Sequence, residues 1–334
     1  MSILYETGFQ PNPRDKEWTR LHYNEFPGDF PYSAYPENQP SELIEELSRR
    51  LVVGKENLLI TCGSDEALYF AFKTFFLGKK NILRPDITYG YYKVWATELG
   101  IDMKEVPLKD DFTIDAQDYS NADGIIIPNP NANTGLALSL AEVEGILKNN
   151  PEATVIIDEA YIEYANVESA VKLLGKYQNL LVTQTFSKAY PLANKRIGYA
   201  IGSAELISKL ATTKNAINEL SVTTDSHELA LACLRNYDYY KKLRQEIIET
   251  RDWVVRELGC APTQANFVLV KFENETQAER TFEALKNKKI LVRRITKPER
   301  LGDYLRISIG TKKQMEEVIK CVKQHLKEKQ KKLR

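Results

Sequence analysis

Short apolar runs alternate with amphipathic segments along the first two thirds of the chain. The runs are NILRP near Ile82, GIIIPNP at residues 125–127, TVIIDEAY at 155–157 and LLVTQTFSK at 180–182. Each is compatible with a strand that is buried on both faces, as in a parallel sheet. Helix-length segments such as GYYKVWATELG and SLAEVEGILKN separate several of them. The alternation predicts an α/β fold with a mostly parallel sheet sandwiched by helices.

The two ends of the chain have a different texture. Residues 1–40 are rich in Pro, Asn, Tyr and Gly, which predicts an extended arm with turns. SELIEELSRRL follows, with Ser41 as the expected helix cap. Beyond residue 231, a long charged helix precedes strands at NFVLVKF, ILVRRI and YLRISIG and helices at QAERTFEALKN and from about Lys313. We therefore expect an arm (1–40), a large domain (41–231) and a smaller α+β domain (232–334).

Composition narrows the classes of partner. The 334 residues are 43% hydrophobic and 28% charged, as in a soluble globular protein with a sizeable core. Lys plus Arg and Asp plus Glu both number 46, so no net charge favours nucleic acid or an acidic membrane. No signal-like segment and no apolar stretch of about 20 residues is present, which favours a cytoplasmic protein. The expected partners are a small molecule and another copy of the chain.

Cysteine and histidine are few and scattered. There is no CxxC pair, so the pattern indicates neither a zinc site nor a disulfide framework, and we expect no metal. These side chains are expected to be structural: Cys62, Cys233, Cys260, Cys321, His22, His227 and His325.

Polar residues follow the predicted strands, at the edge where ligands bind in parallel sheets. The turn GSDE leads into a helix whose free N–H groups could hold an anion, or Ser64 or Asp65 could simply cap that helix. Asp158 ends an apolar strand, where it could cap the next turn or meet a cationic ligand. Tyr161 follows three residues later and offers a phenol nearby.

Lys188 also follows an apolar strand, so its amine is expected to point into the same crevice as Asp158. A partly desolvated lysine has a lowered pKa and can attack a carbonyl to form a Schiff base. Hydroxyls of Thr185 and Ser187 and the guanidinium of Arg196 surround it, and a guanidinium suits a phosphate.

These motifs together resemble those of a known family. GSDE, PNPNxxTG, DEAYxxY and TxSKAxxLAxxR, in this order, are similar to the motifs of fold-type-I pyridoxal-phosphate aminotransferases, in the histidinol-phosphate aminotransferase branch. The similarity runs from LHYNEFP at Leu21 to YLRISIG at Gly310. It implies pyridoxal phosphate as cofactor, an arm that packs with the small domain and a partner subunit, and a homodimer with shared active sites.

The resemblance also implies roles for the strand-end residues. Lys188 holds the cofactor as a Schiff base and moves the substrate proton, Asp158 pairs with the pyridinium nitrogen, and Tyr161 contacts the ring oxygen. The resemblance implies that the cofactor phosphate is bound by Ser64, Asp65, Ser187 and Arg196, with Thr185 near it. Tyr89 matches an aromatic residue that stacks on the cofactor ring. Tyr89 could equally be a core residue, because three tyrosines lie within four positions there.

Further residues are implied for the substrate and for the neighbouring subunit. Arg306 and Arg293 match arginines that bind an anionic substrate, whereas strand alternation turns Arg294 to the other face. Asn24 in LHYNEFP is a further expected substrate contact. Tyr35 matches a tyrosine that reaches the cofactor phosphate of the partner subunit.

Two departures from the family pattern leave alternatives open. PNPNANTG replaces the usual PNNPTG, so Asn131, with Asn133 second, becomes the candidate for the ring-oxygen contact. Without the usual proline, a cis peptide at that place would cost about 2.5–4 kcal/mol. The arm before LHYNEFP is also short, which weakens the case for one particular substrate.

The expected reaction is amino transfer between a small anionic donor and a 2-oxo acid. Histidinol phosphate with 2-oxoglutarate is the favoured pair, and another phosphorylated or amino-acid substrate is the alternative. Threonine-phosphate decarboxylases share the same motifs, so decarboxylation is a second alternative. A cofactor-binding protein without activity is the third, and the joint retention of Lys188, Asp158 and Tyr161 argues against it.

Overall fold

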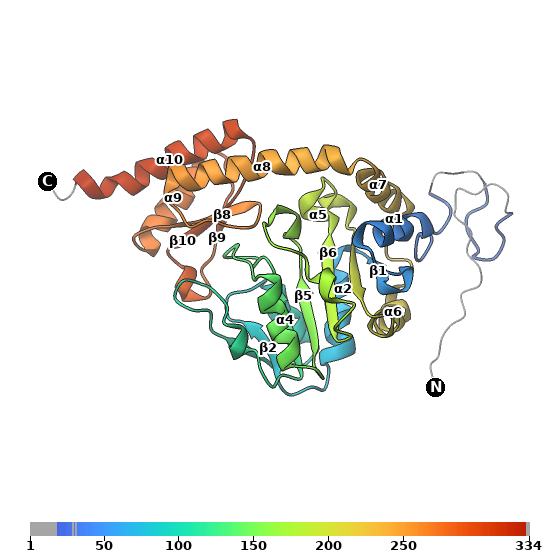
Figure 1. The fold of residues 1–334 in the computed structure, drawn as a ribbon. Coiled ribbons are helices and arrows are strands. Elements are labelled where there is room, and N and C mark those ends of the chain that lie inside the picture. Colours follow the sequence, from blue (N-terminus) through green and yellow to red (C-terminus); the bar gives the residue numbers. More distant parts are fainter. Residues whose placement is uncertain (1–18, 29, 31, 332–334) are drawn as a thin grey trace.

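A seven-stranded sheet forms the centre of the large domain (Figure 1). The computed structural model describes residues 19–28, 30 and 32–331. The strand order is β1-β7-β6-β5-β4-β2-β3, and β7 alone runs antiparallel to its neighbours. The strands are β1 (Leu58–Thr61), β2 (Ile82–Pro85), β3 (Met103–Val106), β4 (Gly124–Pro128), β5 (Thr154–Asp158), β6 (Leu180–Thr185) and β7 (Gly198–Gly202). The prediction of a mostly parallel sheet is confirmed.

Each face of this sheet has its own apolar core, because successive side chains of a strand point to opposite faces. Ile125, Val155 and Val182 pack on the face covered by α1, α4 and α7. Ile126 and Ile156 pack on the face covered by α2, α3 and α6. The bounds are α1 (Ser41–Leu51), α2 (Gly63–Ala71), α3 (Tyr91–Glu98), α4 (Leu140–Asn149), α5 (Phe186–Ala189), α6 (Ala204–Asn218) and α7 (Thr224–Arg235). Burial on both faces explains the continuous apolar runs in the sequence.

The start of α1 differs from the prediction that Ser41 caps it. Pro40 occupies the cap position in an extended conformation, and Ser41 is the first helical residue. The N–H of Ser41 donates instead to Glu37 Oε2 at 3.4 Å. A carboxylate four residues earlier therefore takes the role that the serine hydroxyl was expected to fill.

A three-stranded antiparallel sheet forms the small domain, with order β8-β10-β9. In its core, Val254, Val268 and Leu305 pack with the apolar side chains of the last helix, α10. The predicted strand ILVRRI pairs with its neighbour over two residues alone. The elements are α8 (Tyr237–Leu258), β8 (Phe267–Lys271), α9 (Glu275–Asn287), β9 (Arg293–Arg294), β10 (Tyr304–Ser308) and α10 (Lys312–Lys331).

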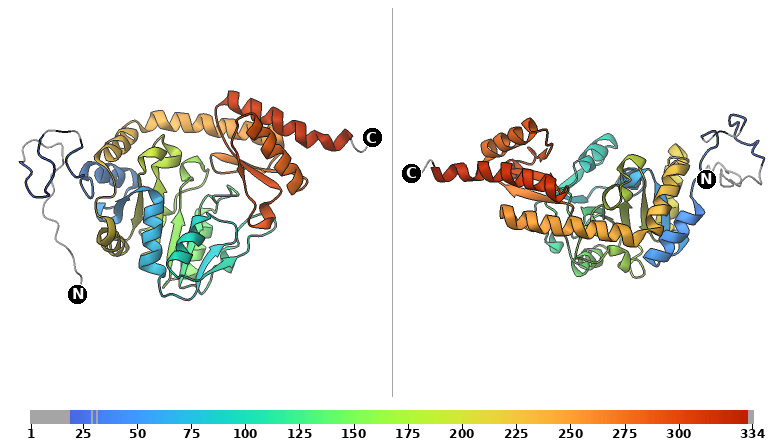
Figure 2. Two further views of the ribbon diagram at one scale, coloured as in Figure 1. Left: turned by 180° about the vertical axis from the view of Figure 1, so that it is seen from behind. Right: turned by 90° about the horizontal axis from the view of Figure 1, so that it is seen from above.

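Helix α8 joins the two domains and runs along both of them (Figure 2). Near its start, Tyr240 and Ile247 pack against the core of the large sheet. Near its end, Val254 packs in the core of the small domain. The division between the two cores therefore falls within α8, later in the chain than the expected boundary at residue 231.

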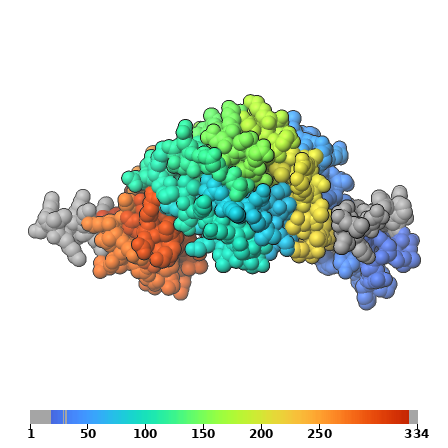
Figure 3. All heavy atoms as spheres, turned by 90° about the horizontal axis from the view of Figure 1, so that it is seen from below, coloured from blue at the N-terminus to red at the C-terminus, as the bar shows by residue number. Residues whose placement is uncertain are grey.

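The described residues of the arm lie at the end of the molecule opposite the small domain (Figure 3). The arm contacts the large domain instead, where Asn38 Nδ2 donates to Glu219 Oε1 at 3.0 Å and Gln39 pairs with the backbone of Ile60. The described residues of the arm therefore do not pack on the small domain of their own chain. Leu21 and Tyr32 are 87% and 84% exposed. Among the described residues, no helix has both the length and the apolar character to cross a membrane.

Candidate active site

A cavity opens at the carboxyl edge of β5 and β6, beside the start of α2. Parallel pairing sets Asp158 opposite Thr183 in the register of β5 and β6, so the residues that follow both strands meet at this edge. The lining consists of Ser64, Asp65, Tyr89, Ala132, Asp158, Ala160, Tyr161, Thr185, Ser187, Lys188 and Arg196. Residues far apart in the sequence therefore form one site, and most of them were predicted.

Asp158 is a buried carboxylate with several hydrogen-bond donors. The hydroxyl of Tyr92 donates to Oδ2 at 2.6 Å, the backbone N–H of Ala160 donates to Oδ1 at 3.2 Å, and the Thr183 hydroxyl lies 3.4 Å from Oδ1. Burial raises the pKa of Asp158 to about 6, against the lowering effect of the Tyr92 bond. Among the described residues no lysine or arginine forms an ion pair with it. A cationic ring nitrogen in the cavity would supply the missing charge.

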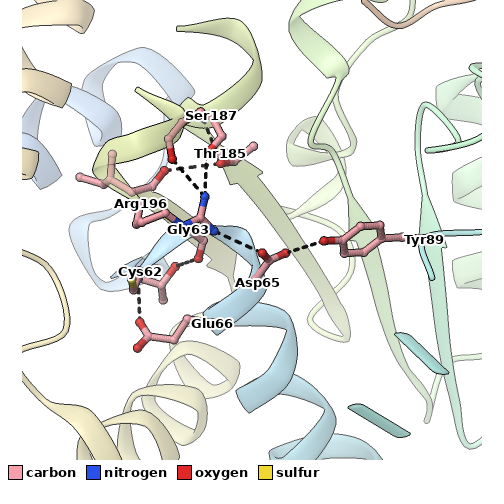
Figure 4. A network of polar contacts seen from close by, with 11 residues as sticks. Cys62, Gly63, Asp65, Glu66, Tyr89, Thr185, Ser187 and Arg196 are labelled. Atoms are coloured by element: carbon pink, nitrogen blue, oxygen red, sulfur yellow. Dashed lines mark hydrogen bonds and ion pairs between the residues drawn. The ribbon is translucent and has the colours of Figure 1, made fainter. Parts of the chain in front are cut away.

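An anion-binding cup surrounds the start of α2 (Figure 4). Arg196 Nη2 donates to Asp65 Oδ2 at 3.2 Å, and Nη1 donates to the Ser187 hydroxyl at 3.4 Å. The Thr185 hydroxyl accepts from the N–H of Ser187 at 3.1 Å and so fixes this turn. Hydroxyls, a guanidinium and a helix N-terminus at one point suit a phosphate.

Gly63 allows Arg196 to approach the helix closely. Its φ of +73° favours glycine, and a Cβ there would lie 2.9 Å from Arg196 Nη2. The helix begins at Gly63, and the N–H of Cys62 before it donates to Glu66 Oε2 at 2.7 Å. The alternative in which Ser64 or Asp65 caps α2 is therefore not found.

Lys188 reaches the same cavity from α5. Its amine lies 5.8 Å from the centre of the Tyr161 ring. The residue is exposed to solvent and lines the cavity, and the protein around its amine partly desolvates that group. Burial, and then the charge of Arg306, lower the pKa of Lys188 below its ordinary value. A larger share of neutral amine makes this lysine a better nucleophile toward a carbonyl.

Tyr89 lies between the cavity and the core of the large domain. It lines the cavity, and its hydroxyl lies 3.3 Å from Asp65 Oδ1. Its ring also packs edge-on against Tyr92, with the ring centres 5.6 Å apart. Tyr161 also lines the cavity, and its ring packs edge-on against Phe267 of the small domain, with the ring centres 5.5 Å apart. The two predicted tyrosines thus both line the site and pack against different aromatic residues.

Asn131 does not line this cavity, contrary to its expected contact with the ring oxygen. Its Nδ2 donates to the carbonyl of Ile87 at 2.8 Å, and its Oδ1 accepts from the N–H groups of Asn133 and Thr134. The side chain therefore braces its own loop, and Ala132 is the loop residue in the cavity. The peptide bond Asn129–Pro130 in this loop is cis.

Two predicted arginines lie on β10 and β9, at the edge of the small domain. Arg306 and Arg293 are register partners. Arg306 Nη1 donates to the carbonyl of Ala132 at 2.5 Å and to Asn133 Oδ1 at 3.2 Å. Arg294 pairs with Glu275 of α9 at 2.8 Å, on the other face, as strand alternation predicts.

Asn24 and Tyr35 do not reach the cavity of their own chain. Both line a separate hollow between the arm and the start of α7, which also contains Lys195 and Asp225. Tyr35 is 50% exposed.

Two contributors to the site were missed from the sequence. Tyr92, which bonds Asp158, lies in the first turn of α3, three residues after Tyr89, and its ring packs edge-on against the Tyr89 ring. Thr183 is two residues before Thr185 and therefore shares its side of β6. These spacings can be read from the sequence. They indicate a contact with Asp158 only when β5 and β6 are known to be neighbouring strands.

Comparison with known proteins agrees with this architecture. A family model described as aminotransferase class I and II matches residues 30–322. The histidinol-phosphate aminotransferase of Brachyspira hyodysenteriae is 38% identical over 343 residues, covering 97% of this chain and 96% of that protein. The histidinol-phosphate aminotransferase 1 of Oceanobacillus iheyensis is 42% identical over 294 residues, covering 86% and 82%.

The same fold occurs in solved structures. The histidinol-phosphate aminotransferase from Clostridium acetobutylicum superposes with a TM-score of 0.79 at 24% identity, covering 87% of this chain and 90% of that one. The extent of the family match and the identity to full-length relatives settle the family. The chain belongs to the aminotransferase class I and II family.

Proposed function

We propose that this chain is a pyridoxal-phosphate-dependent aminotransferase. The observation that carries the proposal is the meeting of three features in one cavity: a buried carboxylate that no lysine or arginine of the described residues pairs with, a lysine of lowered pKa, and a cup of groups suited to an anion. These groups match the ring nitrogen, the aldehyde and the phosphate of that cofactor. Its family membership supports the same activity.

Each residue of the cavity would have a separate role in binding the cofactor or moving a proton. Pyridoxal phosphate supplies an electron-withdrawing ring that stabilises negative charge at a substrate carbon. Asp158 would hold a proton at the ring nitrogen, because a buried carboxylate favours a cation beside it. Lys188 would hold the cofactor covalently through its amine, and once the amino group of the substrate had displaced it, the freed amine would take and return the proton at the substrate α-carbon. Tyr161 and Tyr89, which both line the cavity, would orient the ring.

The phosphate would lie at the start of α2, near Ser64, with Ser187 and Arg196 as further ligands. Arg196 now pairs with Asp65 at 3.2 Å, with 47% of its side chain exposed, so its guanidinium can turn to an added anion. Thr185 would act through the turn that it fixes.

The proposed substrates are an anionic amino donor and a 2-oxo acid. Arg306 and Arg293 are the proposed anion ligands, since both lie on the same side of the small sheet. The names of the relatives favour histidinol phosphate as donor. We propose 2-oxoglutarate as the acceptor. Asn24 is a proposed substrate contact from the partner subunit, because it lies far from the cavity of its own chain.

A screen of half-reactions tests this function without a guess about the acceptor. The protein loaded with pyridoxal phosphate is mixed with single amino donors, including histidinol phosphate, and conversion to pyridoxamine phosphate is followed by absorbance. We expect rapid conversion with an anionic donor and none in Lys188→Ala. Release of carbon dioxide from threonine phosphate would favour the decarboxylase alternative. Cofactor chemistry that survived in Lys188→Ala would refute the assignment.

We also propose a homodimer in which Tyr35 reaches the cofactor phosphate of the partner subunit. The exposed apolar side chains of the arm support it, because such a surface is usually covered by a partner. Light scattering should give twice the mass of one chain. In mixed dimers of Lys188→Ala and Tyr35→Phe, one site has both native residues, so mixing should restore activity. A monomeric mass or no gain on mixing would contradict the proposal.

A further inference from the structure

Two side chains from outside α5 hold the backbone at Lys188. The helix is a single turn that ends at Ala189, so its last carbonyl groups have no partner within the helix. The hydroxyl of Tyr164 donates to the carbonyl of Lys188 at 2.6 Å. Arg244 Nη1 donates to the carbonyl of Ala189 at 3.4 Å. The carbonyl groups of Lys188 and Ala189, which lack a partner within the helix, therefore accept hydrogen bonds from these two side chains.

Tyr164 is itself held close to the candidate site. It is the last residue of the 3₁₀ helix η4 (Ile162–Tyr164), which starts directly after Tyr161, and its N–H donates to the Tyr161 carbonyl at 3.0 Å. The side chain is buried, with 3% exposed. Burial raises the pKa of Tyr164 to about 12, so the hydroxyl keeps its proton and acts as a donor.

Arg244 is equally fixed. Its Nη2 pairs with Glu163 Oε2 at 2.8 Å, one residue before Tyr164. Its guanidinium carbon lies 5.1 Å from the centre of the Tyr190 ring and 5.0 Å from that of Tyr237. The ion pair with Glu163 and the two tyrosine rings thus hold Arg244 within hydrogen-bond distance of the Ala189 carbonyl.

Helix η4, which contains Tyr164, is also linked by hydrogen bonds to the small domain. Arg251 Nη1 donates to the carbonyl of Tyr164 at 3.2 Å and to the carbonyl of Ala265 at 3.2 Å. Ala265 lies two residues before β8, which pairs with the strand that contains Arg306. Tyr164 therefore lies between the lysine on one side and the small domain on the other.

We propose that Tyr164 is a positioning residue for Lys188, with Arg244 supporting the neighbouring carbonyl. The lysine amine reaches the cavity on a long flexible stem, so its location depends on where its backbone is held. Tyr164 holds that backbone at a fixed place relative to Asp158 and Tyr161, because Asp158 ends β5 and the short segment that follows it contains both tyrosines. The inference rests on the proposed function of Lys188.

Tyr164→Phe tests the proposal because it removes the hydroxyl and keeps the ring. The full-length chain, stripped of cofactor, is mixed with pyridoxal phosphate, and the adduct at Lys188 is trapped with borohydride and measured by peptide mass spectrometry. We expect trapping to be about tenfold slower, as for loss of one buried hydrogen bond. We also expect the pH midpoint of Lys188 acetylation to rise towards its ordinary value, because a looser side chain is better hydrated.

Tyr119→Phe is the matched control. Tyr119 is buried, with 1% exposed, and its hydroxyl has no hydrogen-bond partner within the described part of the chain. This variant should trap the cofactor at the rate of the unmodified chain. If Tyr164→Phe equals Tyr119→Phe in both trapping rate and acetylation midpoint, the positioning role is refuted.

A second variant covers the case in which Tyr164→Phe does not fold. Arg244→Lys keeps the positive charge opposite Glu163 but loses the planar donor that reaches Ala189. It should trap the cofactor a few times more slowly, and an unchanged rate would overturn the proposal. If the unmodified chain forms no adduct at Lys188, the proposed function itself fails, and this inference fails with it.

Discussion

Asp158→Asn should make the cofactor-free protein more stable at neutral pH. Burial raises the pKa of Asp158 from 3.8 to about 6. The folded chain therefore binds this proton more tightly than the unfolded chain, and stability falls as the pH rises from about 4 to about 6. One pKa unit corresponds to about 1.4 kcal/mol, so the ionised carboxylate lowers the free energy of unfolding by about 3 kcal/mol above pH 6.

Asparagine cannot ionise, so the variant escapes this loss. The assay is urea unfolding of the cofactor-free protein at several pH values from 4 to 8, with the variant compared with the unmodified chain at each. The stability difference in favour of the variant should grow by about 3 kcal/mol across this range and then level off. Glu159, whose pKa burial raises to about 7, is present in both proteins. The charge of Asp158 makes only a small contribution to that rise, so most of the titration of Glu159 cancels.

Added pyridoxal phosphate should reverse the order. The unmodified chain gains stability from the cofactor through mass action, whereas the variant binds it weakly and gains little. A difference that stayed constant from pH 4 to pH 8 would refute the claim that burial destabilises the ionised Asp158. A variant stabilised by the cofactor as much as the unmodified chain would refute its pairing with the ring nitrogen.

Three further changes test the rest of the site. Arg196→Gln should weaken pyridoxal phosphate binding about 10- to 100-fold in a fluorescence titration, because it removes a charged phosphate ligand. Lys195→Gln is the control and should not weaken it. Equal affinities of the two variants for the cofactor would contradict the role of Arg196 in the phosphate cup. Gly63→Ala should lower the free energy of unfolding by about 1–2 kcal/mol and lower Tm in a thermal melt, because φ is +73° and the new Cβ meets Arg196; an unchanged Tm would show that the turn is not constrained. Arg306→Gln should raise KM for the anionic donor at least about tenfold in steady-state kinetics, while Arg294→Gln, on the other face, should leave it unchanged.

The sequence by itself determined the class of fold and the ends of the central strands. Runs such as those at residues 125–127 and 155–157 are apolar throughout because both faces of each strand are buried. Strand ends are local features, so the positions of Asp158 and Lys188 just beyond them could be predicted without knowing which strands are neighbours. The same holds for Arg294, whose orientation follows from alternation along one strand.

Only the tertiary structure decided which of these groups meet and what each one bonds. The pairing of β7 with β1, the bond from Tyr92 to Asp158 and the anchoring of Lys188 by Tyr164 all join separate segments of the sequence. Local pattern contains no information about such contacts, because they depend on how layers pack. Asn131 shows the same limit, since its amide is taken by backbone groups that fold back over it. Composition and spacing therefore supplied the candidate groups, and packing of the two domains assigned their partners.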